Sequence, residues 1–151
     1  MLVAAVDSFG YRLLFLLHII SIVVAFAPAF VWPVVAVQLR KDGQPIGPVM
    51  AKLRAGNNMR IHGPALALAG IFGLGMVGLS DKAIKFSQSW VSTALLIWFV
   101  MLGVLFALLV PAERIADGSD RKAEQRVSML GGILHVLLLL MLIDMIWQPG
   151  R

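Results

Sequence analysis

Long apolar stretches and short polar segments follow one another along the chain. The apolar stretches cover about residues 13–39, 63–79, 90–110 and 127–147. A helix needs roughly 20 mainly apolar residues to cross the hydrocarbon core of a bilayer. We therefore predict an all-α fold, an integral membrane antiparallel four-helix bundle, in which residues 1–151 form a single transmembrane domain.

The first apolar stretch contains Pro28 and Pro33, which we expect to kink its helix. It is far longer than the roughly 7–15 apolar residues of a signal peptide, so we expect a retained helix. After it, residues 49–60 fit two interpretations. They form either a solvated loop or a short interfacial helix that turns Met50 to lipid and Arg54 to phosphates.

The composition excludes most soluble classes of protein. Hydrophobic residues make up 60% of the 151 positions and charged residues only 14%. A water-soluble domain of this size has too much surface to be so apolar, which excludes an ordinary soluble enzyme and a disordered chain. The net charge of +5 is confined to the loops, so we predict the lipid bilayer and not nucleic acid as partner. No cysteine is present, so the chain has no disulfides or thiolate ligands.

Basic residues predict the orientation in the membrane. Nine of them lie in the loops after the first and third stretches, against four on the other side. The positive-inside rule then places both termini outside the cytoplasm, in a multi-pass protein of the cytoplasmic (inner) membrane. Tyr11, Trp90 and Trp147 would fall together at the outer interface, where amphipathic rings are enriched.

Small residues predict which helices touch, because they allow close backbone approach within a membrane. They recur at every fourth position in the first two apolar stretches. The two sets are Ser21, Ala25 and Ala29 in the first stretch and Ala65, Ala69 and Gly73 in the second.

Ionisable residues inside a span are costly and are therefore candidates for function. His18 shares a face with small residues and should point into the bundle. His135 follows Gly131 and Gly132 at i−4 and i−3, which leaves bare backbone beside an imidazole, as a flat ring ligated by histidine needs. We predict a cofactor-binding role for these four residues, with His18 as the metal ligand. The alternative is that each histidine only hydrogen-bonds a neighbouring carbonyl or serine.

The ligand class stays open between haem, another porphyrin and a metal. One haem held by both histidines is disfavoured, because His18 and His135 differ in depth by roughly 7 Å at 1.5 Å per residue. Copper is less favoured still. Met141 and Met145 share a face and suit Cu(I), but they lie nine or more residues from any histidine on their own face.

Asp144 near the end of the fourth stretch and Arg12 near the start of the first fall at similar depth. A carboxylate is best tolerated at that depth when it is paired, so we predict an Arg12–Asp144 ion pair between neighbouring first and fourth helices. The alternative is that Asp144 reaches water alone.

Two segments, LLHIISIVVAFAPAFVWP and MRIHGPALALAGIFGLGM, carry a family resemblance. The chain resembles actinobacterial four-helix predicted integral membrane proteins of unknown function. The motifs that carry this resemblance are the Leu-His-Ile around His18, Arg60 before Pro64, Gly70, and Trp90. That family is similar to copper-resistance-D-type proteins and distantly to the membrane protoporphyrinogen oxidase. The resemblance implies a four-helix fold and a porphyrin or metal contact at His18.

The chain also departs from the oxidases it resembles. Their third span carries a lysine shortly after the tryptophan, where this chain reads WVSTALLIW. Their fourth span opens with Arg and an Asn-Glu pair, whereas here only Arg126 remains. The resemblance therefore does not extend to the enzyme activity.

We expect a binding or accessory protein of the cytoplasmic membrane that holds a tetrapyrrole or metal through an intramembrane histidine. The first alternative is a structural subunit of a respiratory or other membrane complex with no ligand of its own. The second is an oxidoreductase of the porphyrin pathway. Other membrane-protein subunits or further copies of the chain are the expected protein partners.

Overall fold

The computed structural model describes residues 6–54 and 56–150. All regular structure in these residues is helical, as predicted. The elements are α2 (Phe9–Lys41), α3 (Ile46–Arg54), the π-helical segment η1 (Asn58–His62), α4 (Gly63–Leu79), α5 (Ser89–Gly103), the π-helical segment η2 (Val104–Leu109), α6 (Val110–Ile115) and α7 (Arg121–Trp147).

Four helical stretches of the described chain are long and apolar enough to cross a membrane. They are Phe9–Lys41, Ile46–Leu79, Ser89–Ile115 and Arg121–Trp147. Each contains one of the four apolar stretches of the sequence. The protein is accordingly a four-helix, multi-pass membrane protein by the length and composition of its helices.

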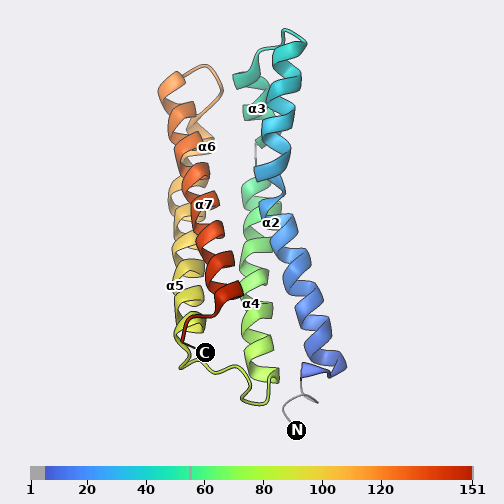
Figure 1. Ribbon diagram of the computed structural model, residues 1–151. Helices are drawn as coiled ribbons and strands as arrows, with labels where there is room; N and C mark the ends of the chain where they lie inside the picture. The colour runs from blue at the N-terminus through green and yellow to red at the C-terminus, as the bar shows by residue number, and fades with distance from the viewer. Residues whose placement is uncertain (1–5, 55, 151) are drawn as a thin grey trace.

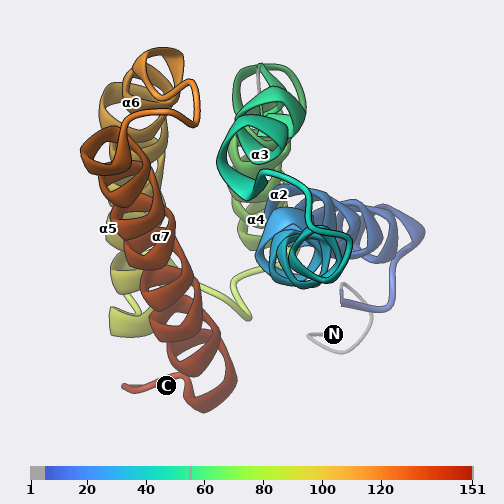
Figure 2. The same ribbon diagram turned by 90° about the horizontal axis from the view of Figure 1, so that it is seen from above.

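The four long helices pack in pairs. α2 lies along α4, and α7 lies along α5, η2 and α6. Seen from above, the two pairs stand apart from one another (Figure 2). The start of α2 and the end of α7 lie at the bottom of Figure 1, and we call this end of the molecule the terminal end. α3 and the turn between α6 and α7 lie at the other end, which carries most of the basic residues and which we call the basic end.

Small residues bring α2 and α4 together, as their spacing predicts. Ser21 on α2 is buried, as are Ala65 and Ala69 on α4. Gly75 shows how close the backbones are, because a Cβ built there would lie 2.8 Å from Cδ1 of Leu14. The predicted contact between the first two apolar stretches is therefore confirmed.

Both π-helical segments end shortly before a proline. η1 ends at His62 and Pro64 follows two residues later; η2 ends at Leu109 and Pro111 follows two residues later. Proline has no N–H, so the carbonyl four residues before it loses its α-helical donor. A local shift to i→i+5 hydrogen bonds is one way for a helix to accommodate that loss.

α2 remains one helix through Pro28 and Pro33, and Figure 2 shows that it bends along its length. The segment after α2 is helical, so the solvated-loop interpretation of its first part is wrong. α3 follows the interfacial interpretation only in part, because Lys52 and Leu53 are exposed but two other residues turn inward. Met50 is buried and Arg54 forms an ion pair within the protein.

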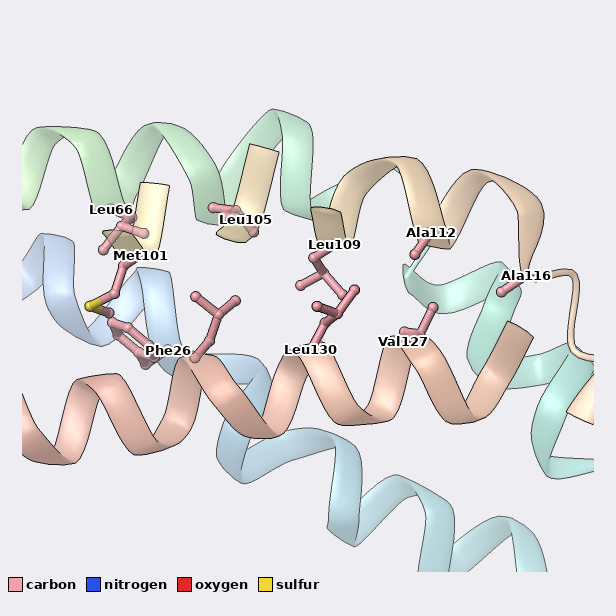
Figure 3. Packing of buried hydrophobic residues seen from close by; sticks show 10 residues of the cluster. Phe26, Leu66, Met101, Leu105, Leu109, Ala112, Ala116, Val127 and Leu130 are labelled. Carbon is pink, nitrogen blue, oxygen red and sulfur yellow. The ribbon is translucent and has the colours of Figure 1, made fainter. Parts of the chain in front are cut away.

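One hydrophobic cluster extends along α5 to α7 toward the basic end and joins the two pairs (Figure 3). Most of its members come from α5 to α7, where Leu109 and Leu130 point toward one another. Phe26 from α2 and Leu66 from α4 reach the same cluster beside Met101, which is only 1% exposed. Phe26 and Leu66 thereby separate two cavities between the helix pairs.

Candidate functional site

Two cavities lie between the helix pairs, and Phe26 and Leu66 line both of them. The terminal-end cavity has a volume of about 350 Å³ and includes His18 in its lining. The basic-end groove has a volume of about 550 Å³ and includes His135. The structure therefore places the two candidate histidines in separate sites, as their difference in depth predicts.

His18 is held in one orientation by the neighbouring helix. It is 6% exposed, and its Nδ1 lies 2.6 Å from the carbonyl oxygen of Ala69. A carbonyl can only accept, so Nδ1 carries the hydrogen and donates it, and in the neutral ring Nε2 keeps a lone pair. The ring rests beside Gly73, where a Cβ would lie 3.4 Å from Cε1. Histidines that ligate metals are oriented by such a bond from the other ring nitrogen.

The rest of the terminal-end cavity is mainly apolar. Four thioethers line it, from Met76, Met101, Met141 and Met145. Trp90 also lines it, and the Nε1 of Trp90 is buried without a hydrogen-bond partner among the described residues. Trp90 is thus buried and does not serve as the interfacial anchor that the sequence predicts.

Two methionines of α7 share a cavity with a histidine of another helix. His135, the histidine of their own helix, lines the other cavity. Met141 and Met145 instead line the same cavity as His18, which comes from α2. Spacing within one helix could not show this, because the juxtaposition depends on how the two pairs meet.

Trp98 links the two pairs between the cavities. Its Nε1 donates to the carbonyl oxygen of Leu66 at 2.9 Å. Its indole lies directly against Gly70, where a Cβ would come within 2.0 Å of the ring. A glycine is therefore required at position 70 for α4 and α5 to meet in this way.

The basic-end groove contains the bare glycine patch. An added Cβ would meet nothing within 4 Å at Gly131 or Gly132, so the backbone there is open. His135 lines the groove and is itself exposed. Among the described residues no hydrogen bond orients its ring, in contrast to His18.

Four polar side chains, which we call the polar roof, line the groove at the basic end: Arg54, Asn58, Glu113 and Glu124. The sequence pattern does not predict their contacts. Arg54 of α3 donates to Glu124 of α7 at 2.6 Å, with side chains only 12% and 20% exposed. Asn58 of η1 donates to Glu113 of α6 at 2.8 Å. In the sequence, the feature that could have indicated these contacts is the presence of two carboxylates, Glu113 and Glu124, near span ends in otherwise basic loops. Both contacts connect one helix pair to the other.

The predicted Arg12–Asp144 pair is not formed. Arg12 pairs with Asp7, five residues earlier, at 2.7 Å and in an exposed position. Asp144 is 8% exposed, and its Oδ2 has no hydrogen-bond partner among the described residues. The physical reason is the pairing of helices: α7 packs along α5 and α2 packs along α4. The side chain of Asp144 is largely buried, which leaves little of it for the alternative contact with water.

No family model, no curated protein and no solved structure matches the chain. The family resemblance drawn from sequence motifs thus stays a prediction. Within the described ranges, no three His, Cys, Asp or Glu side chains are arranged to hold a metal ion. The site must be interpreted from its own geometry, and the best-ordered ligating group in it is His18.

Proposed function

We propose that the protein is a binding protein of the cytoplasmic membrane that holds a tetrapyrrole through His18. The observation that carries the proposal is the bond from the Nδ1–H of His18 to the carbonyl of Ala69. It fixes the ring and leaves Nε2 as the nitrogen with a lone pair, in a side chain that lines an apolar cavity.

A tetrapyrrole suits a cavity that offers one imidazole. The macrocycle brings four nitrogen ligands of its own, so the protein has to supply only one or two axial groups. Histidine and methionine are both axial ligands of haem iron, and His18 shares its cavity with four methionines. The group would supply a coloured centre whose metal can change oxidation state.

His18 is favoured over His135 because of its surroundings. His18 is buried and oriented by a hydrogen bond, whereas His135 is exposed and has no orienting bond within the described chain. Ligands held by preorganised groups lose less conformational entropy on binding. Gly131 and Gly132 leave room for a flat ring beside His135, which makes that groove the comparison site for the experiment.

We infer in addition that the basic end faces the cytoplasm. The nine-to-four distribution of basic residues supports this orientation. It is also consistent with the exposed Trp147 at the end of α7, at the terminal end of the molecule (Figure 1).

The test is visible absorption of the purified protein in detergent, before and after titration with haemin. We expect a Soret band in the natural sequence that is lost in His18→Ala and kept in the matched variant His135→Ala. Free imidazole should restore the band to His18→Ala, which a purely structural role for His18 would not allow. His18→Gln keeps an N–H donor for Ala69 and serves as a folding control by circular dichroism.

Three results would overturn the proposal. A natural protein that is colourless as purified, does not shift the Soret band of added haemin and co-purifies with a larger complex supports the structural-subunit alternative. A band kept in His18→Ala but lost in His135→Ala moves the site to the basic-end groove. A band unchanged in both variants shows that neither histidine holds the macrocycle.

A further inference from the structure

A third hollow, separate from the two cavities between the pairs, lies at the basic end among α3, η1 and α6. Its volume is about 550 Å³. Three basic side chains from these three elements line it: Lys52, Arg60 and Arg114. We call this feature the basic hollow.

The three cations of the basic hollow are not neutralised by partners. In the part of the chain that the structure describes, none of their side chains makes a hydrogen bond or an ion pair. Unpaired cations that converge on one concave surface make a region of positive potential. Such a surface favours an anion.

The two carboxylates that line the same hollow are both engaged elsewhere. Glu113 accepts a hydrogen bond from Asn58 at 2.8 Å. Asp117 accepts from the hydroxyl and the backbone N–H of Ser119 at 2.6 and 2.9 Å. These bonds hold the pKa of Asp117 below its ordinary value, so its negative charge is already stabilised within its own turn.

The guanidinium of Arg60 lies against the turn at Gly56. Gly56 has φ of +78°, a conformation that favours glycine, and the Nε of Arg60 lies 3.7 Å from the position of an added Cβ there. Apolar side chains adjoin the cations. Met59, Ile61 and Ile115 are all exposed, next in sequence to Arg60 or Arg114.

We infer that the basic hollow binds the phosphate of an anionic phospholipid. The hollow lies where the apolar helices end, which is the depth of lipid headgroups if these helices span the bilayer. Basic pockets between transmembrane helices are a known type of lipid headgroup site. The exposed apolar side chains beside the cations can contact the acyl chains of a lipid. A free phosphate ion has no apolar part that could make such contacts. This inference does not depend on the tetrapyrrole.

The test compares two variants that lose the same charge at the same end. Lys52→Gln/Arg60→Gln/Arg114→Gln removes the cations of the hollow. Arg121→Gln/Lys122→Gln/Arg126→Gln removes three exposed cations of α7 that line none of the three hollows. Binding of phosphatidylglycerol and phosphatidylcholine to each protein in detergent is measured by native mass spectrometry.

We expect the natural protein to bind phosphatidylglycerol about a hundredfold more tightly than phosphatidylcholine, since three basic residues near a lipid surface contribute about 1 kcal/mol each. The hollow variant should lose that preference and the α7 variant should keep it. An equal loss in both variants would show diffuse attraction and would overturn the site. So would full displacement of the lipid by inorganic phosphate at matched ionic strength, which would indicate a site for the free ion.

The hollow variant could lose lipid binding simply by misfolding, which circular dichroism would detect. In that event the single variants Arg60→Gln and Arg114→Gln decide the question. Each should weaken phosphatidylglycerol binding by about fivefold, the effect of one basic residue. Single variants that fold and bind the lipid normally would overturn the inference.

Discussion

Gly70 and Gly132 are both helical glycines that line cavities between the pairs, yet they have opposite surroundings. A Cβ at Gly70 would lie 2.0 Å from the indole of Trp98, whereas a Cβ at Gly132 would meet nothing within 4 Å. The first glycine allows two helices to approach, and the second leaves backbone open in a groove. The residue type alone cannot distinguish these roles.

Gly70→Ala should therefore destabilise the fold and Gly132→Ala should not. The added methyl displaces Trp98 and strains its bond to Leu66, at a cost of about 2 kcal/mol, as for other overpacked cores. Gly132→Ala should be neutral or stabilising by up to about 1 kcal/mol, because alanine favours the helix. Unfolding in mixed detergent and SDS, followed by circular dichroism, measures both. Equal stability of the two variants would contradict the close packing of Trp98 on α4.

At the same scale, the sequence singles out candidate residues but does not show what they touch. His18 was identifiable because an ionisable group inside an apolar stretch is rare. Its partner is a backbone carbonyl of Ala69, 51 residues away, which no spacing rule indicates. Arg54 and Glu124 looked like ordinary loop charges, and only the folded chain brings them together across 70 residues.

At the scale of elements, apolar runs predicted the four long helices but not where each one ends. α7 begins at Arg121, six residues before its predicted span, because Asp120 caps it by accepting a hydrogen bond from the N–H of Lys122. A hydropathy pattern stops at the first polar residues, while the helix continues until its cap. Small-residue spacing predicts the contact of α2 with α4, but the sequence pattern does not predict that α7 packs along α5 and not along α2.

The ion pair between α3 and α7 should stabilise the fold more than the ion pair at the start of α2. Glu124→Gln leaves the mostly buried Arg54 without its charged partner and should cost about 2 kcal/mol, less than the roughly 3–5 kcal/mol of a fully buried pair. Arg12→Gln breaks a pair of similar length whose side chains are 67% and 56% exposed, and should cost no more than about 0.5 kcal/mol.

A double-mutant cycle separates the interaction from the cost of burying a charge. Arg54→Met with Glu124→Gln should be more stable than the sum of the two single changes implies, because neither variant side chain leaves an unpaired charge. The free energies of unfolding are measured as for the glycine variants. Additive effects would mean that Arg54 and Glu124 do not interact in the membrane-embedded protein.

At the scale of the whole molecule, two helix pairs are joined at the middle and at one end. The middle link is the cluster around Phe26, Leu66 and Met101, with the bond from Trp98 (Figure 3). The second link is the polar roof of the basic-end groove. The terminal-end cavity, which contains His18, lies beyond the middle link. A ligand in this cavity would touch both pairs, since residues of α2, α4, α5 and α7 line it.

The orientation of the molecule gives the last prediction. Four candidate spans return the chain to the side on which it began, and α2 starts at the same end at which α7 ends (Figure 1). Nine basic residues lie in the loops at the other end, the basic end. They favour retention of the basic end in the cytoplasm, because basic segments near a span resist translocation. Alkaline phosphatase fused after Arg151 should therefore be active, since it folds only outside the cytoplasm, and green fluorescent protein at the same position should be dark. Fusions within the loop between α6 and α7 should show the reverse. Fluorescence at the C-terminus would place the basic hollow outside the cell and would refute the assigned orientation while leaving the helix pairing intact.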